Sequence, residues 1–231
     1  MELGPVLPML PIVPVDWNPA YRIVPTRYPS VFLFDRVADA SDFDALYELE
    51  AMTNDRIRDE IGELRLVPPQ DRLFGPGSGP IMAAFTHLNP AGSRFSDGRW
   101  GVFYAARDRS TAIAETRYHH ARFLAATRQP AMHLPMRLYR VTIAAPLHDL
   151  RADTPALRAV HDPVDYRAGQ ALAAELRAGG SAGVVYHSVR EPGGQNVGLF
   201  KPTAARDCLH AAHLLYHWNG TGFTAVYEKT D

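Results

Sequence analysis

From about residue 84 onward, short apolar segments alternate in quick succession with polar turns and helix-like segments, and this mixture constrains the fold most. Strands are predicted at 102–106, 136–143, 183–186, 197–200, 210–218 and 223–228, and helices at about 108–126 and 165–178. These elements do not repeat as regular βαβ units, which favours an α+β domain over a doubly wound parallel sheet. We therefore expect one α+β domain, with a small mixed or antiparallel sheet surrounded by helices. Asn219-Gly220 between the last two strands predicts a hairpin with a type I′ turn.

The first third of the chain differs from the rest in its proline content and its predicted elements. Residues 1–30 contain seven prolines, each of which fixes φ and removes a backbone donor, so this segment is expected to be extended and irregular. Residues 31–89 are predicted to be a mainly helical insertion or extension, in which Ser41 caps a helix that reaches about Leu64. Residues 90–231 would then form the core, ending in the hairpin.

Composition excludes several classes of protein. Hydrophobic residues make up 46% of the 231 residues and the formal net charge is −1, so we expect a globular chain with no direct binding to nucleic acid. Cys208 is the single cysteine, which excludes an intrachain disulfide. Apolar runs of membrane-spanning length and a basic signal-peptide start are both missing, so no membrane association and a cytoplasmic location are expected.

Three residues of different chemistry stand at nearly equal intervals along successive elements. Arg94 lies in a Gly-Ser-Arg loop, Tyr104 ends a short strand ten residues later, and Glu115 follows after eleven more on a helix. A cation, an aromatic face and a carboxylate on three successive elements can line one pocket. Such a set suits an anionic ligand with a flat ring and a sugar, a description that NAD fits. Arg99 is a weaker candidate than Arg94 for gripping a pyrophosphate.

Two interpretations of Glu115 stay open at this point. It can be an ordinary solvated glutamate near the start of a helix. Alternatively, its carboxylate stabilises the oxocarbenium character that develops when a nicotinamide glycosidic bond breaks. Tyr104 likewise can be a core tyrosine with a satisfied hydroxyl, or it can stack on nicotinamide.

A second polar loop, at 186–196, lies between two of the predicted strands. Ser188, Gln195 and Asn196 offer neutral hydrogen-bonding groups there, and Gly193-Gly194 permits positive φ and close backbone approach. The loop could complete the same pocket, although an ordinary surface hairpin loop would look similar.

The order of these motifs resembles the RES domain. The matching segments are Tyr21-Arg22, Gly92–Phe95 as Gly-x-Arg-aromatic, Tyr-Ala-Ala at 104–106, Ala-x-x-Glu at 112–115 and Gly-Val-Val-x-x-Ser at 183–188. The resemblance covers roughly residues 21–201. There are two departures: Gly-Ser-Arg-Phe-Ser replaces the usual Gly-Gly-Arg-Trp-Asn at 92–96, and the 31–89 segment is longer than in compact members.

The resemblance implies a fold related to ADP-ribosyltransferase toxins and NAD as a consumed substrate. The implied catalytic residues are Glu115, Arg94 and Tyr104, and Arg22 and Ser188 take further binding positions. The implied protein is the toxin of a toxin–antitoxin pair, inhibited by an Xre-type antitoxin. Inorganic phosphate, water and a protein side chain stay open as acceptors of the ADP-ribosyl group, which makes an NAD phosphorylase, an NAD glycohydrolase and a protein ADP-ribosyltransferase all possible.

The sequence offers three other functions: a metal site, a thiol hydrolase and an inactive interaction module. His213 and His217 would share one face of a strand while His210 points away, so no metal site is expected. Cys208 lies on a predicted strand with no helix N-terminus to lower its pKa, which disfavours a thiol hydrolase. A catalytically inactive RES-fold interaction module stays as the non-enzyme alternative.

Overall fold

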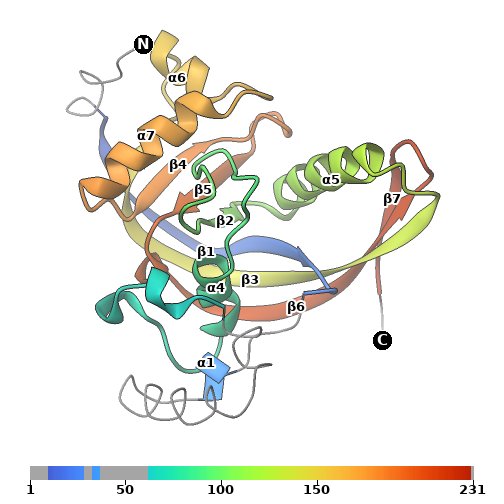
Figure 1. Cartoon of the computed structure of the whole chain (residues 1–231), viewed down its shortest axis with the longest axis horizontal. Coiled ribbons are helices and arrows are strands. Elements are labelled where there is room, and N and C mark those ends of the chain that lie inside the picture. The colour runs from blue at the N-terminus through green and yellow to red at the C-terminus, as the bar shows by residue number, and fades with distance from the viewer. Residues whose placement is uncertain (1–9, 29–32, 37–61, 230–231) are drawn as a thin grey trace.

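The computed structural model describes residues 10–28, 33–36 and 62–229 of the chain (Figure 1). Most of the helix expected from Ser41 lies outside the described residues, as does most of the predicted insertion. What is described of the 31–89 segment comprises α1 (Leu33–Arg36), the 3₁₀ turns η2 (Leu64–Leu66) and η3 (Pro69–Asp71), and α4 (Gly79–Thr86). The division of the chain at residues 30 and 89 stays a prediction.

Seven strands form one sheet in the order β1-β2-β5-β4-β3-β6-β7. Their bounds are β1 Ile12–Pro25, β2 Phe103–Ala106, β3 Met132–Asp149, β4 Gly183–His187, β5 Gln195–Leu199, β6 Ala205–Trp218 and β7 Phe223–Glu228. Only the short β3–β4 pairing is parallel, so the sheet is mixed, as predicted. Because β1 pairs with both β2 and β3, the strands β1, β2, β5, β4 and β3 form a closed ring of neighbours. Strands β6 and β7 continue the sheet beyond β3.

The described part of the proline-rich N-terminal segment, residues 10–28, is extended but is not irregular, which corrects the expectation for these residues. It contains β1, which pairs antiparallel with β3 from Ile12↔His148 to Pro25↔Met136. Prolines are tolerated because the opposite edge of β1 meets β2 only at Tyr21↔Ala106, and the β1–β3 register shifts between Trp17 and Ala20, around Pro19.

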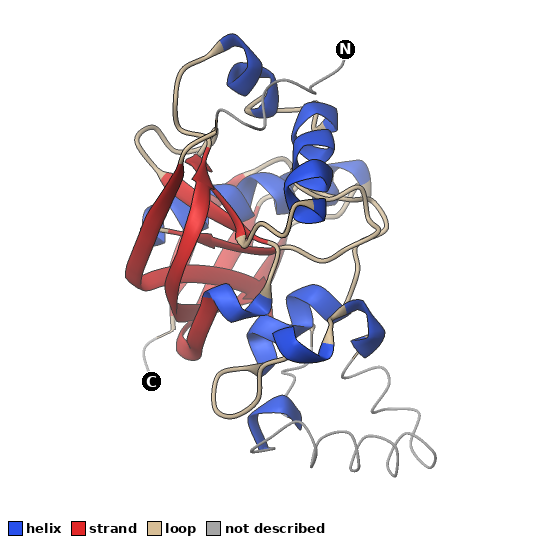
Figure 2. Ribbon diagram, turned by 90° about the vertical axis from the view of Figure 1, so that its left-hand side faces the viewer, coloured by secondary structure: helices blue, strands red, loops and turns tan. Residues whose placement is uncertain are grey.

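Helices cover the sheet on more than one side. Figure 1 places α6 (Pro155–Val160) and α7 (Arg167–Ala178) above β4 and β5, α4 below, and α5 (Arg109–Ala126) beside β7. Viewed from the side, the strands gather on the left and most of the helices lie to their right or above (Figure 2). Among the described residues, no helix combines the length and apolar character needed to cross a membrane.

The three strands β2, β5 and β4 separate two apolar clusters, because alternate side chains of a strand face opposite ways. Phe103, Val197 and Val185 join the cluster that contains Phe85 of α4. Their neighbours along the strands face the other cluster, under α6 and α7, where the buried residues include Phe95, Trp100, Leu172, Val184 and Tyr186. A third cluster packs α5 against β3, β6 and β7.

The C-terminal hairpin is confirmed, but its predicted turn type is wrong. Trp218 pairs with Phe223, so four residues, 219–222, form the loop. Gly220 has φ +99°, whereas Asn219 lies outside the positive φ region that a type I′ turn requires. Instead, the Asn219 side-chain Oδ1 accepts hydrogen bonds from the backbone N–H groups of Thr221 and Gly222, both at 2.9 Å.

Candidate functional site

Glu115 is held in place by two neutral donors from distant parts of the chain. Its Oε1 atom accepts hydrogen bonds from Ser188 Oγ at 2.7 Å and from Asn196 Nδ2 at 2.8 Å. Ser188 follows β4, Asn196 belongs to β5, and Glu115 lies in the second turn of α5. The Glu115 side chain keeps 21% of its surface exposed, and its Oε2 atom lies 3.9 Å from His119 Nε2. One carboxylate oxygen is therefore fixed by the protein, while the other has no hydrogen-bond donor among the described residues.

The loop after β4 positions Ser188 through its own backbone. Ser188 Oγ accepts hydrogen bonds from the N–H groups of Arg190 at 3.1 Å and Glu191 at 3.0 Å. The hydroxyl proton remains free to be donated to Glu115. Gly194 lets this loop approach α5, because a Cβ at that position would lie 2.5 Å from Thr111 Oγ1.

Tyr104 anchors the loop that carries Arg94. Its hydroxyl lies 2.8 Å from Ser93 Oγ and accepts a hydrogen bond from the Phe95 N–H at 3.0 Å. Burial raises the pKa of the Tyr104 hydroxyl to about 12, so it stays protonated at neutral pH. The Tyr104 hydroxyl is therefore satisfied within the protein, and stacking of its ring on nicotinamide stays a prediction.

Arg94 is a buried guanidinium without an acidic partner among the described residues. Its Nη1 donates to the carbonyl oxygens of Val160 at 2.7 Å and Asp162 at 2.8 Å, on either side of His161. The guanidinium also lies 4.7 Å from the centroid of the Tyr166 ring. Arg94 thus ties the 92–101 loop to the connection between α6 and α7, and it forms no ion pair with a described carboxylate, although its charge helps to lower the pKa of Asp162.

Tyr186 links these groups and was missed in the sequence analysis. The edge of its buried ring meets Phe95, with ring centroids 4.9 Å apart. Burial raises its pKa well above the usual value, the charge of Glu115 raises it further, and the charge of Arg94 lowers it. Tyr186 faces the same side of the sheet as Asn196 and Tyr104, because Tyr186 pairs with Asn196 and Tyr104 with Gly198. One sequence signal could have found it. Val184 and Tyr186 are two residues apart on a predicted strand, so their side chains face the same side of the sheet.

The charges of three arginines, Arg190, Arg122 and Arg94, act on His119, which lies one helical turn after Glu115. Partial burial, followed by the charges of Arg190, Arg122 and Arg94, lowers the pKa of His119 to about 4. Arg190 lies over the Tyr118 ring, 3.3 Å from its centroid, and donates to the Pro163 carbonyl oxygen, which the Tyr118 hydroxyl also reaches at 3.4 Å. The surroundings of Glu115 are therefore electropositive.

Three other residues predicted for the site form no hydrogen bond or ion pair with Glu115. Arg22 donates to the Tyr104 carbonyl oxygen at 2.9 Å and lies over the Phe103 ring, which faces the opposite side of β2 from the Tyr104 ring. Arg99 pairs with Asp97 at 2.6 Å on the surface. Gln195 Oε1 accepts a hydrogen bond from Arg151 at 2.9 Å, and pleating turns this side chain away from the face of Asn196.

The histidines of β6 are arranged differently from the prediction. Tyr139 pairs with His210 and Leu138 with Ala212, so Ala211 is an extra residue in β6 and turns His210 toward His213, with ring centroids 4.4 Å apart. The prediction that His210 points away was therefore wrong. Across the described ranges, no group of three histidine, cysteine or acidic side chains has the spacing of a metal site. Burial raises the pKa of Cys208 to about 12, which leaves it a thiol at neutral pH.

Comparison with known proteins gives the family. The RES domain model matches residues 69–219. The uncharacterized protein y4oC of Sinorhizobium fredii (strain NBRC 101917 / NGR234) is 29% identical over 219 residues, covering 91% of this chain and 87% of that protein. The crystal structure of the M. tuberculosis MbcT–MbcA toxin–antitoxin complex aligns with 95% of this chain and 87% of that one at 12% identity, with a TM-score of 0.46, a likeness too remote for a functional argument. The resemblance of the motifs is thus confirmed, and the chain belongs to the RES domain family.

Proposed function

We propose that this protein is the toxin of a toxin–antitoxin pair, and that it cleaves the nicotinamide–ribose bond of NAD and transfers the ADP-ribosyl group to an acceptor. The observation that carries the proposal is the Glu115 carboxylate. Ser188 and Asn196 hold one of its oxygens, and the other is turned into electropositive surroundings. Membership of the RES family supports the same activity.

In the proposed reaction, the C1′–N bond to nicotinamide breaks and its electron pair leaves on the pyridine nitrogen, which becomes neutral. Positive charge develops on the ribose, and Glu115 stabilises it because the carboxylate is already oriented. The acceptor atom, an oxygen of phosphate or water or a side-chain heteroatom, then bonds to C1′ through a lone pair and releases a proton where it carries one. Ser188 and Asn196 act as positioning residues for Glu115, since they hold the carboxylate and leave its second oxygen available.

The guanidinium groups near Glu115 suit the phosphates of NAD. Arg94, Arg122 and Arg190 all lower the pKa of His119, and no acidic side chain forms an ion pair with them in the part of the chain that the structure describes. Uncompensated cations attract anions most strongly where water is partly excluded. We assign the pyrophosphate to this side of Glu115, with Arg94 as the most buried of the three cations.

The acceptor is identified by the products. The protein is incubated with NAD alone, with inorganic phosphate and with cell lysate, and the products are identified by mass spectrometry. Free nicotinamide is expected in every condition that contains the acceptor: with NAD alone for hydrolysis, on addition of phosphate for phosphorolysis, and on addition of lysate for modification of a protein. The second product distinguishes the three. Intact NAD under all three conditions, with a folded protein, would contradict the proposal and favour an inactive interaction module.

A further inference from the structure

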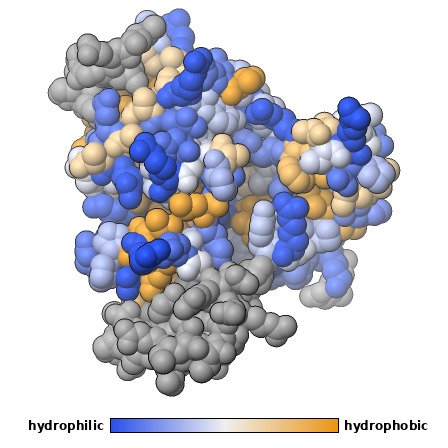
Figure 3. Space-filling model, in the orientation of Figure 1, coloured by the Kyte–Doolittle hydropathy of each residue, from blue (hydrophilic) through white to orange (hydrophobic). Residues whose placement is uncertain are grey.

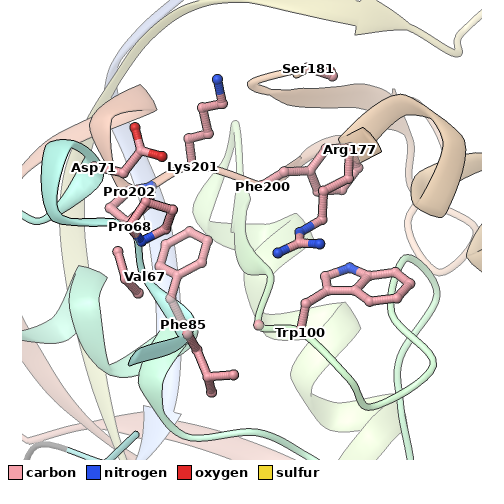
Figure 4. A pocket seen from close by; sticks show the side chains of 12 residues that line it. Val67, Pro68, Asp71, Phe85, Trp100, Arg177, Ser181, Phe200, Lys201 and Pro202 are labelled. Carbon is pink, nitrogen blue, oxygen red and sulfur yellow. The ribbon is translucent and has the colours of Figure 1, made fainter. Parts of the chain in front are cut away.

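A cavity of about 210 Å³ lies between η2 and η3, α4, the end of α7 and the connection from β5 to η4. The candidate site contributes nothing to this lining, which contains none of its residues: Arg94, Tyr104, Glu115, Tyr186, Ser188 and Asn196. Figure 4 shows Arg177 and Trp100 on one side of it, and Asp71, Lys201, Pro68 and Phe85 on the other. In Figure 3, hydrophobic residues interrupt the hydrophilic surface in the left half of the view.

The walls of the cavity are aromatic and rigid. Phe85, Trp100 and Phe200 line it, and each is at most 9% exposed. Gly101 fixes the spacing of two of them, because a Cβ at that position would lie 2.2 Å from the Ala84 carbonyl oxygen. The Trp100 indole N–H is held by the Phe95 carbonyl oxygen at 3.0 Å. These rings therefore form a fixed surface on which a flat group can stack.

Two cations line this aromatic cavity without an acidic partner. The Arg177 guanidinium carbon lies 5.5 Å from the centroid of the Trp100 ring, and its head group points into the space between Trp100 and Phe85 (Figure 4). Neither Arg177 nor Lys201 forms an ion pair with any described residue. Asp71 is the one acidic side chain of the lining, which leaves a formal lining charge of +1. A single negative charge on the ligand would balance this lining.

We propose that this cavity binds a small planar monocarboxylate, with its ring against Trp100, Phe85 and Phe200 and its carboxylate accepting hydrogen bonds from Arg177. Lys201 adds attraction from the opposite rim. The volume of about 210 Å³ is below the roughly 300–1,000 Å³ of pockets that hold drug-sized ligands, so the ligand is of the size of one substituted ring. The planar fork of Arg177 matches a carboxylate better than a point charge would.

The cavity is also connected to the loop that carries Arg94. The Trp100 carbonyl oxygen accepts a hydrogen bond from Ser96 Oγ at 2.6 Å, and the Phe95 N–H donates to the Tyr104 hydroxyl at 3.0 Å. A ligand that contacts Trp100 therefore touches the 92–101 loop itself, in which Trp100 is hydrogen-bonded to Ser96 and Phe95. This provides a local reporter of binding, the indole N–H of Trp100.

The test is an NMR titration of the full chain with benzoate, and with benzamide as the uncharged analogue. The indole N–H resonance of Trp100 is assigned by Trp100→Phe. Benzoate is expected to shift this resonance with saturation and to bind at least about tenfold more tightly than benzamide, because a charged hydrogen bond is lost in the analogue. Excess NAD should not displace benzoate, whether or not NAD is the substrate.

The variants are Arg177→Gln and Lys201→Gln, with Arg158→Gln as the matched control, since Arg158 pairs with Asp153 on the surface outside the cavity. Each of the two cavity variants should weaken benzoate binding several-fold, and the control should leave it unchanged. If Arg177→Gln disturbs the packing of Trp100, the benzoate affinity of Lys201→Gln alone tests the proposal. Equal affinity for benzoate and benzamide, displacement by NAD, or unchanged binding in folded Lys201→Gln would overturn the proposal.

Discussion

Glu115 illustrates how a residue that looks ordinary in sequence acquires a specific environment in the fold. On its helix it is a partly exposed glutamate, the less specific of the two interpretations left open above. The structure adds two donors from β5 and from the loop after β4, more than seventy residues away, which fix one carboxylate oxygen. Such a contact depends on strand order, which residue spacing alone does not reveal.

Arg94 leads to a prediction at the same scale. Its Nη1 serves two carbonyl oxygens while the guanidinium lies over Tyr166, and a lysine ammonium cannot reproduce this geometry. Arg94→Lys should weaken NAD binding, and it should also destabilise the fold by about 1–3 kcal/mol because buried acceptors lose their donor. Calorimetric titration with NAD and thermal unfolding measure the two effects.

Arg99→Lys is the matched control for that variant. Arg99 is exposed, pairs with Asp97 on the surface and lies 5.7 Å from the centroid of the Trp100 ring, so its replacement should change NAD affinity and stability much less. If Arg99→Lys weakened NAD binding more than Arg94→Lys did, the assignment of Arg94 to the ligand would be wrong.

At the scale of elements, helix α5 carries adjacent histidines that titrate abnormally. Partial burial, followed by the charges of Arg27 and His119, lowers the pKa of His120 to about 4. The pKa of His119 is lowered to about 4 by the same cause and by the charges of Arg190, Arg122 and Arg94, but its side chain is 53% exposed, so solvent screens its contribution to stability. The unfolded chain, with histidine pKa values near about 6.5, therefore binds more protons than the native state between about pH 4 and 6.5. The free energy of unfolding should consequently fall as the pH is lowered through this window.

Urea unfolding at several pH values between 4 and 7 checks this prediction. His120→Gln should reduce the pH dependence, whereas His133→Gln, an exposed histidine on β3, should retain it. A pH dependence that is the same in His120→Gln as in the wild type would show that His120 does not supply it.

Most core elements were predictable, and the reasons for the exceptions are physical. Strands β2, β4, β5 and the β6–β7 hairpin follow from apolar alternation and turn residues. The strand β1 was missed because prolines argue against a central strand, and sequence does not reveal that β1 pairs along most of its length on one edge only. Tyr186 was missed because an aromatic residue on a buried strand looks like core until the neighbouring strands are known.

At the scale of the whole molecule, the proposed toxin should be harmful to the cell that makes it. Expressed alone, the wild-type chain should arrest growth, because consumption of NAD removes a central redox carrier. We propose that an Xre-type antitoxin blocks this activity, so co-expression with it should restore growth. Normal growth with abundant, folded wild-type protein would exclude the toxin and favour a housekeeping enzyme that processes NAD.

In the proposed reaction, the Glu115 carboxylate, oriented by Ser188 and Asn196, drives cleavage of NAD. The most direct measurement is the rate of nicotinamide release from NAD by wild type, Glu115→Gln and Glu191→Gln, with folding checked by circular dichroism. Loss of one preorganised electrostatic group lowers a rate by roughly 10²–10³, so Glu115→Gln should lose that much. Glu191→Gln, which alters a carboxylate in the neighbouring loop, should stay near wild type. A folded Glu115→Gln variant within a few-fold of the wild-type rate would contradict the claim.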